Sequence, residues 1–222
     1  MVRVTDLTAY VAPAHFVDSD HPDVIEWARE HGGSSRDPRD RAVALFYAVR
    51  DGLRYDAYNT SADPADYRAS MIVQQRAGWC VSKSVLLTAA ARAAGIPARL
   101  GFADVRNHLS TPKLTEHMGT DVFAWHGYTE FWLDDRWIKA SSAFNIEMCE
   151  RFGTKALEWD GVHDALMHPF DQAGNKHMEY IAQRGSFVDL PLDEIFATFR
   201  EIYPSWFERL ETTDVTPAAA AS

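Results

Sequence analysis

The chain of 222 residues is poor in cysteine, with only Cys80 and Cys149. Two thiols are too few for the disulfide framework of a small secreted domain. Free thiols in a reducing compartment are the expected state, with a single bridge as the alternative. The first sixteen residues also lack an apolar segment behind a basic start, so no secretory signal peptide is predicted. We therefore expect a cytoplasmic protein.

Basic clusters and long apolar runs are also missing. The net charge is −10 and no segment is rich in lysine or arginine, which argues against nucleic acid as a partner. No apolar run approaches the roughly 20 residues that span a bilayer, so no membrane partner is expected. There is no internal repeat and no dividing linker, and 46% of the residues are hydrophobic, which suits one domain over residues 1–222.

Metal-binding spacings are absent as well. The sequence has no C-x-x-C or H-x-x-x-H pair, and His108, His117 and His126 are far apart, so neither a metal nor a cofactor is expected.

A second group of polar residues follows later in the chain. We interpret it as solvated surface pairs, with a substrate-selecting cover as the alternative. Its members are Asp160, His163, Asp164, His168, Asp171 and His177.

Helical patterns fill much of the chain. Residues 24–31 predict a short helix, and residues 38–53 predict an amphipathic helix capped by Asp37 or Ser35. These lie in an N-terminal helical part, 1–54, which a polar loop over 55–67 follows. A third helix starts at Cys80 and ends at Gly95 and Pro97. Helix and loop segments are expected over a C-terminal helical lobe, 146–212, before a disordered tail, 213–222.

The strand signals lie between these helices. Residues 98–105 alternate between apolar and polar, and a polar excursion follows over 107–120. Residues 121–145 are rich in aromatic and β-branched side chains around Asp134-Asp135, which predicts an antiparallel hairpin. Helices followed by an antiparallel sheet indicate an α+β fold, with its core at about 37–145.

Cys80 is the main candidate for chemistry. It follows Gly78 and Trp79 and opens a long apolar helix. The first turn of a helix presents free N–H groups and the positive end of the macrodipole. These should stabilise a thiolate, so we expect a lowered pKa and a nucleophilic sulfur.

His126 is the candidate base for this thiol. It lies inside the predicted hairpin strand beside Gly127, which leaves room next to it. Strand alternation puts it on one face with Ala124, Tyr128 and Glu130. A histidine that only packs within the sheet is the alternative to a base that acts on Cys80.

Several of these residues resemble the core of the transglutaminase-like superfamily. The resemblance covers roughly residues 55–145 and implies a papain-like α+β fold, in which the nucleophile heads a central helix packed on an antiparallel sheet. It also implies a Cys-His-Asp triad that acts on amide bonds, with Cys80 as nucleophile and His126 as base. The matching residues are Gly78-Trp79-Cys80, Leu86, Ala91, Arg92, Gly95-Ile96-Pro97-Ala98-Arg99, His126-Gly127-Tyr128, Glu130, Leu133 and Trp137.

The third member of the triad departs from this family. An aspartate is common four residues after the strand tryptophan, and here that position holds Ser141. Ser141 could orient the imidazole without a charge, or Asn145 could do so through its amide oxygen. A degenerate site is the remaining alternative.

An oxyanion would be held by the Cys80 backbone N–H and a second donor. Gln74, six residues ahead of the thiol, is the candidate, and Gln75 lies next to it. Trp79 and Trp125 could wall the cleft or simply fill the core.

The predicted function is cysteine-dependent acyl transfer through a thioester. The substrate would be a peptide or small molecule with an amide or related acyl bond, attacked by water or an amine. One alternative is a biosynthetic enzyme that uses the pair of Cys80 and His126 for an unusual bond-forming or bond-breaking step. The other is an inactive binding module. The sequence leaves the oligomeric state open.

Overall fold

The computed structural model describes residues 6–58, 60–108, 119–166, 171, 173–174 and 177–213. Part of the predicted polar excursion, most of the predicted disordered tail, and His117 and His168 lie outside these residues. In the part that is described, no helix is both long enough and apolar enough to cross a membrane.

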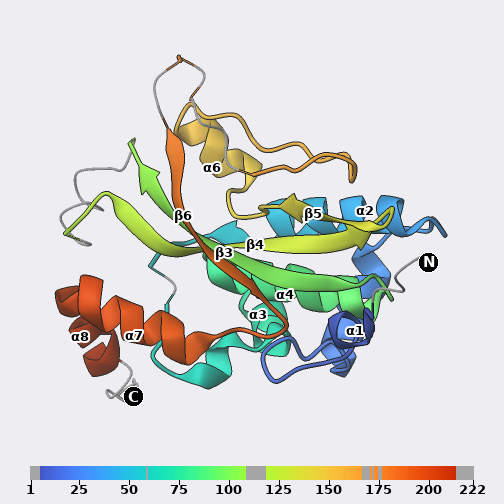
Figure 1. Ribbon diagram of the computed structural model, residues 1–222, viewed down its shortest axis with the longest axis horizontal. Coiled ribbons are helices and arrows are strands. Elements are labelled where there is room, and N and C mark those ends of the chain that lie inside the picture. Colours follow the sequence, from blue (N-terminus) through green and yellow to red (C-terminus); the bar gives the residue numbers. More distant parts are fainter. Residues whose placement is uncertain are drawn as a thin grey trace, which may run out of the picture.

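A four-stranded antiparallel sheet carries the molecule, in the order β5-β4-β3-β6. Helix α4 packs against β3 and β4, and α1, α2 and α3 surround α4 (Figure 1). The helices are α1 (Pro22–His31), α2 (Pro38–Gly52), α3 (Ala69–Gln75), α4 (Cys80–Ala93), α6 (Ile146–Arg151), α7 (Leu192–Ile202) and α8 (Pro204–Thr213). The strands are β1 (Arg54–Tyr55), β2 (Ala77–Gly78), β3 (Ala98–Asn107), β4 (Val122–Leu133), β5 (Arg136–Ala140) and β6 (Met178–Phe187).

The α+β fold predicted from the sequence is confirmed, with Cys80 at the first position of the central helix. Every residue of α4 from Cys80 to Arg92 is buried, including the polar side chains of Ser82, Lys83, Ser84, Thr88 and Arg92. The helix ends where Gly95 adopts a φ of +76°. There the N–H of Gly95 donates to the Arg92 carbonyl at 2.8 Å, and Pro97 prevents continuation.

Local signals also set the first helices and the hairpin. Helix α2 is capped by Asp37, whose carboxylate accepts from the N–H of Arg39 at 2.9 Å. Strands β4 and β5 are joined by Asp134 and Asp135, with φ values of 50° and 59°. Both central residues have positive φ, as in the tight turns that match the twist of paired strands. The predicted hairpin is confirmed.

The predicted helical lobe over 146–212 needs a correction, because part of it is a strand. Strand β6 pairs with β3, from Leu100 opposite Phe187 to Asn107 opposite Met178. It forms the sheet edge and most of its residues are exposed or half-buried, so it lacks the apolar alternation that marks a strand. The long-range partner, rather than local sequence, makes this segment extended. The end of this lobe is helical as predicted and forms two helices, α7 and α8, of which the second begins at Pro204.

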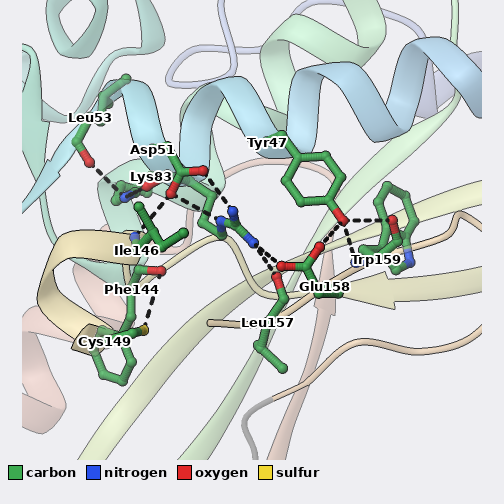
Figure 2. A network of polar contacts seen from close by, with 11 residues as sticks. Tyr47, Asp51, Leu53, Lys83, Phe144, Ile146, Cys149, Leu157, Glu158 and Trp159 are labelled. Carbon is green, nitrogen blue, oxygen red and sulfur yellow. Dashed lines mark hydrogen bonds and ion pairs between the residues drawn. The ribbon is translucent and has the colours of Figure 1, made fainter. Parts of the chain in front are cut away.

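A buried lysine joins the central helix to α2 (Figure 2). Lys83 is fully buried, and its ammonium donates to the carbonyls of Arg50 at 2.9 Å and Leu53 at 2.8 Å. These carbonyls belong to the end of α2 and the residue after it, where the helix dipole favours a positive charge. Burial lowers the pKa of Lys83 to about 7. The contact fixes the start of α4, three residues after the thiol.

Candidate active site

Two short strands place Cys80 at the start of α4. Strand β2 pairs in parallel with β1, with Tyr55 opposite Gly78, and the chain then enters the helix. The Ser82 hydroxyl accepts a hydrogen bond from the N–H of Trp79 at 3.0 Å and so caps the first turn. A Cβ at position 78 would lie 2.4 Å from the Ser82 Oγ, so this tight entry requires glycine at Gly78.

Gly127 is the point where β4 meets the start of α4. A Cβ there would lie 2.7 Å from the Ser84 Oγ, 3.0 Å from the Cys80 carbonyl oxygen and 3.1 Å from the Val81 Cα. The backbone of Gly127 therefore packs directly on the first turn of α4, at the residue that carries the candidate thiol. The space beside Gly127, which we expected to accommodate the histidine, is occupied by the first turn of α4.

The imidazole of His126 lies beside Ser141 and Tyr180. Its Nε2 lies 3.4 Å from the Ser141 Oγ, and its ring centroid lies 6.2 Å from that of Tyr180. His126 and Ser141 are both buried. Tyr128 and Glu130, which lie on the same face of β4 as His126, also contact β6. The Tyr128 hydroxyl donates to Gln183 at 3.0 Å, and Ser186 donates to Glu130 at 2.9 Å.

The expectation of a lowered thiol pKa is wrong. Hydrogen bonds from the N–H groups of Gly127, Val81 and Cys80 do lower it, but burial outweighs them and raises the pKa of Cys80 to about 11. Burial also lowers the pKa of His126 to about 4. Both groups are therefore neutral at pH 7.

Two tyrosines near the sulfur escaped the sequence reasoning. Burial raises the pKa of Tyr55 well above its ordinary value, and a charge on Cys80 would raise it further. Burial also raises the pKa of Tyr203 to about 12, and a charge on Cys80 would make a smaller contribution in the same direction. Tyr55 comes from the predicted loop and Tyr203 from the C-terminal helices, so neither position carried a sequence signal.

Two of the expected polar residues are engaged elsewhere. The Gln74 amide donates to Asp23 at 3.0 Å, which turns it toward α1, so it does not supply an oxyanion donor in this structure. The Asn145 Oδ1 accepts from the N–H of Tyr55 at 3.1 Å, so this amide holds β1. Of the two proposed partners for the imidazole, the structure brings Ser141 to it.

The two tryptophans differ in their surroundings. Trp125 is buried against Phe102 and Phe187, and its indole donates to Thr198 at 2.9 Å, so it fills core space. Trp79 packs on Phe199 and borders a small cavity. The other residues that line this cavity are Thr60, Ser61, Asp66, Tyr67, Gln75 and Ser82.

The remaining candidates lie apart from the thiol. His108 pairs with Glu179 at 2.9 Å. The exposed His163 pairs with Asp160 at 2.7 Å, as the interpretation of surface pairs expects, whereas His177 of the same group is buried. Among the described residues, no three histidine, cysteine or acidic side chains are arranged to hold a metal ion. Cys149 is a free, buried thiol in α6, and burial raises its pKa.

A family model supports this picture directly. The model of the transglutaminase-like superfamily matches residues 25–142, which include the thiol, the imidazole and Ser141. The chain belongs to the transglutaminase-like superfamily. The match starts thirty residues earlier than the resemblance found in the sequence and so takes in most of α1 and all of α2.

Among solved structures, the chain is similar to a candidate cysteine protease from Cytophaga hutchinsonii, with 20% identity and a TM-score of 0.48 over 62% of this chain and 42% of that one. It is also similar to the periplasmic domain of TgpA from Pseudomonas aeruginosa, with 19% identity and a TM-score of 0.44 over 63% and 48% of the two chains. The chain thus spans less than half the length of either protein. A search of curated proteins gives no match.

Proposed function

We propose that this member of the transglutaminase-like superfamily is a cysteine-dependent acyl-transfer enzyme that acts on an amide or related acyl bond. The observation that carries the proposal is the packing of Gly127, the residue after His126, on the first turn of α4, where an added Cβ would lie 3.0 Å from the Cys80 carbonyl oxygen. The imidazole of His126 is buried, and its Nε2 lies 3.4 Å from the Ser141 Oγ. A nucleophile, a base and a group that orients the base are therefore all buried and lie on neighbouring segments of the chain.

The reaction starts from neutral groups. With Ser141 accepting the Nε2–H of His126, the free Nδ1 takes the proton of Cys80, and the sulfur forms a bond to the acyl carbon. The carbonyl electron pair moves to the oxygen, where the Cys80 N–H holds the charge. The carbon–nitrogen bond then breaks, and the imidazolium protonates the leaving amine. Water or a second amine then attacks the thioester carbon and gives a proton to the imidazole. The carbon–sulfur bond breaks and releases the acid or the new amide, and the imidazolium returns its proton to the sulfur.

An inactive binding module is the second candidate, and two observations favour it. Ser141 holds the position where the resemblance expects a carboxylate, so no charge stabilises an imidazolium there. Burial also raises the pKa of Cys80 to about 11, which disfavours a resting thiolate. A module of this kind would bind an acyl or peptide ligand and form no adduct.

The test is covalent trapping on the sulfur. We expect p-nitrophenyl acetate to acetylate Cys80 and release one equivalent of p-nitrophenol in a burst, with the adduct located by intact mass and peptide mapping. Cys80→Ser abolishes the burst, His126→Ala slows it, and Cys149→Ser serves as the matched thiol control. Equal burst rates in wild type and His126→Ala would refute the proposed pair, and the absence of a burst and of an adduct in the wild type would favour the binding module.

Two finer points belong to this proposal. Adding a primary amine distinguishes transfer from hydrolysis, since an amine that resolves the thioester yields an acylated amine in place of acetate. A peptide or small-molecule library screened for adducts on Cys80 then narrows the substrate. A cytoplasmic location stays a prediction, which fractionation of cells that produce the protein checks.

A further inference from the structure

Strand β4 has one extra residue immediately before the candidate base. Ala103 of β3 pairs with His126, and Val105 pairs with Phe123. Between these pairs β3 has one residue, and β4 has two, Ala124 and Trp125. This is a β-bulge, a feature that re-aims side chains and interrupts the ladder of backbone hydrogen bonds.

Trp125 adopts a backbone conformation that bulky residues rarely take. Its φ is +59°, in the left-handed region that favours glycine. Such a conformation costs free energy and persists only where the surroundings fix it from several sides. The next residue in the chain is His126, so the direction of the imidazole depends on this bend being kept.

Side chains take up the backbone groups that the bulge leaves unpaired. The N–H of Trp125 donates to the Asp104 carboxylate at 3.1 Å. The N–H of Ala124 donates to the Tyr203 hydroxyl at 2.7 Å, and the same hydroxyl donates to the Val122 carbonyl at 2.7 Å. One phenol thus bonds the strand on both sides of Phe123, as a donor and as an acceptor.

Further contacts hold these two side chains. Arg184 of β6 binds Asp104 through two hydrogen bonds of 2.8 and 2.9 Å, and its guanidinium lies 5.2 Å from the centre of the Trp125 ring. The indole of Trp125 donates to Thr198 of α7. Tyr203, between α7 and α8, is buried. Figure 1 shows these two helices at the end of the molecule where β4 begins.

We propose that Tyr203 is a positioning residue, which keeps the bulge before His126 closed and so aims the imidazole at the reacting sulfur. The inference rests on the proposed function for the role of His126 in acyl transfer. It assigns to the C-terminal helices, outside the matched family region, a part in assembling the site. Because burial raises the pKa of Tyr203 to about 12, the phenol stays protonated and able to donate over the working pH range.

The test compares two Tyr→Phe substitutions, each of which removes one hydroxyl that forms a hydrogen bond to or from β4. Tyr203→Phe removes the hydroxyl at the bulge, whereas Tyr128→Phe removes a hydroxyl bound to Gln183 from the same strand without touching the bulge. We expect Tyr203→Phe to slow acetylation by p-nitrophenyl acetate about tenfold or more at saturating ester. The NMR signals of His126 should shift or broaden in that variant. Tyr128→Phe should keep both the rate and the signals.

The outcomes separate the inference from the function on which it rests. If His126→Ala slows acetylation while Tyr203→Phe behaves as Tyr128→Phe does in rate and spectrum, the positioning role is refuted. If His126→Ala leaves the rate unchanged, the proposed function fails, and the His126 signals in Tyr203→Phe still decide the positioning role. Should Tyr203→Phe not fold, Thr198→Val frees the Trp125 indole and is expected to change rate and spectrum in the same direction.

Discussion

Gly127→Ala tests the contact between the nucleophile helix and the base strand. The added Cβ would lie 2.7 Å from the Ser84 Oγ. It would also lie 3.0 Å from the Cys80 carbonyl oxygen and 3.1 Å from the Val81 Cα, both in the first turn of α4. The Ser84 hydroxyl already donates to the Val81 carbonyl at 2.7 Å, so moving it breaks a buried hydrogen bond. Strand and helix must therefore separate by a few tenths of an ångström.

The size of the effect follows from this overpacking. Extra methyl groups in a well-packed core cost about 1–3 kcal/mol, and we expect a loss of unfolding free energy in that range. A misplacement of about 1 Å can cost about a hundredfold in rate, so a shift of a few tenths should slow Cys80 acetylation about tenfold. Urea unfolding and the p-nitrophenol burst measure the two effects separately.

Two further variants sharpen this experiment. Gly101→Ala overpacks the same sheet against the Tyr128 ring, away from α4, so it should destabilise the protein and leave acetylation nearly unchanged. Ser84→Ala combined with Gly127→Ala removes the 2.7 Å contact and should recover part of the stability, but not all, because the backbone contacts stay. If Gly127→Ala keeps the wild-type burst rate and stability, the strand and helix are not packed as described, and the reasoning is refuted.

Three other predictions use the polar groups of the site. Ser141→Asp puts a carboxylate beside Nε2 and should raise the pKa of His126 and speed acetylation, as NMR titration and burst kinetics would show, whereas a slower burst would contradict it. Burial raises the pKa of Cys80 to about 11, so alkylation by iodoacetamide should keep rising above pH 9, and a plateau below pH 8 would overturn this. Burial lowers the pKa of Lys83 from 10.5 to about 7, so above pH 7 the unfolded chain binds more protons and stability rises with pH. Urea unfolding should show that Lys83→Met removes this slope of up to about 1.4 kcal/mol per pH unit, and equal slopes in both proteins would contradict the lowered pKa of Lys83.

The sequence by itself determined the elements whose signals are local. A proline and an aspartate start α2, Gly95 and Pro97 end α4, and paired aspartates make the turn between β4 and β5. Helical and strand periodicities indicated the other elements that were predicted, because each pattern reports burial on one element and is independent of its neighbours. The same local patterns identified Cys80 and His126 as the residues to examine.

Only the tertiary structure decided what surrounds those two residues. Strand β6 is extended because it pairs with β3, and neither its pattern of exposed residues nor its composition indicates a strand. The thiol pKa rises because the packed chain buries the sulfur, an effect that outweighs the N–H groups at the helix start. Ser141 reaches the imidazole, Gln74 turns away, and Tyr203 bonds the strand from far along the chain. These are contacts between segments distant in sequence, and only the packing of the whole chain selects them.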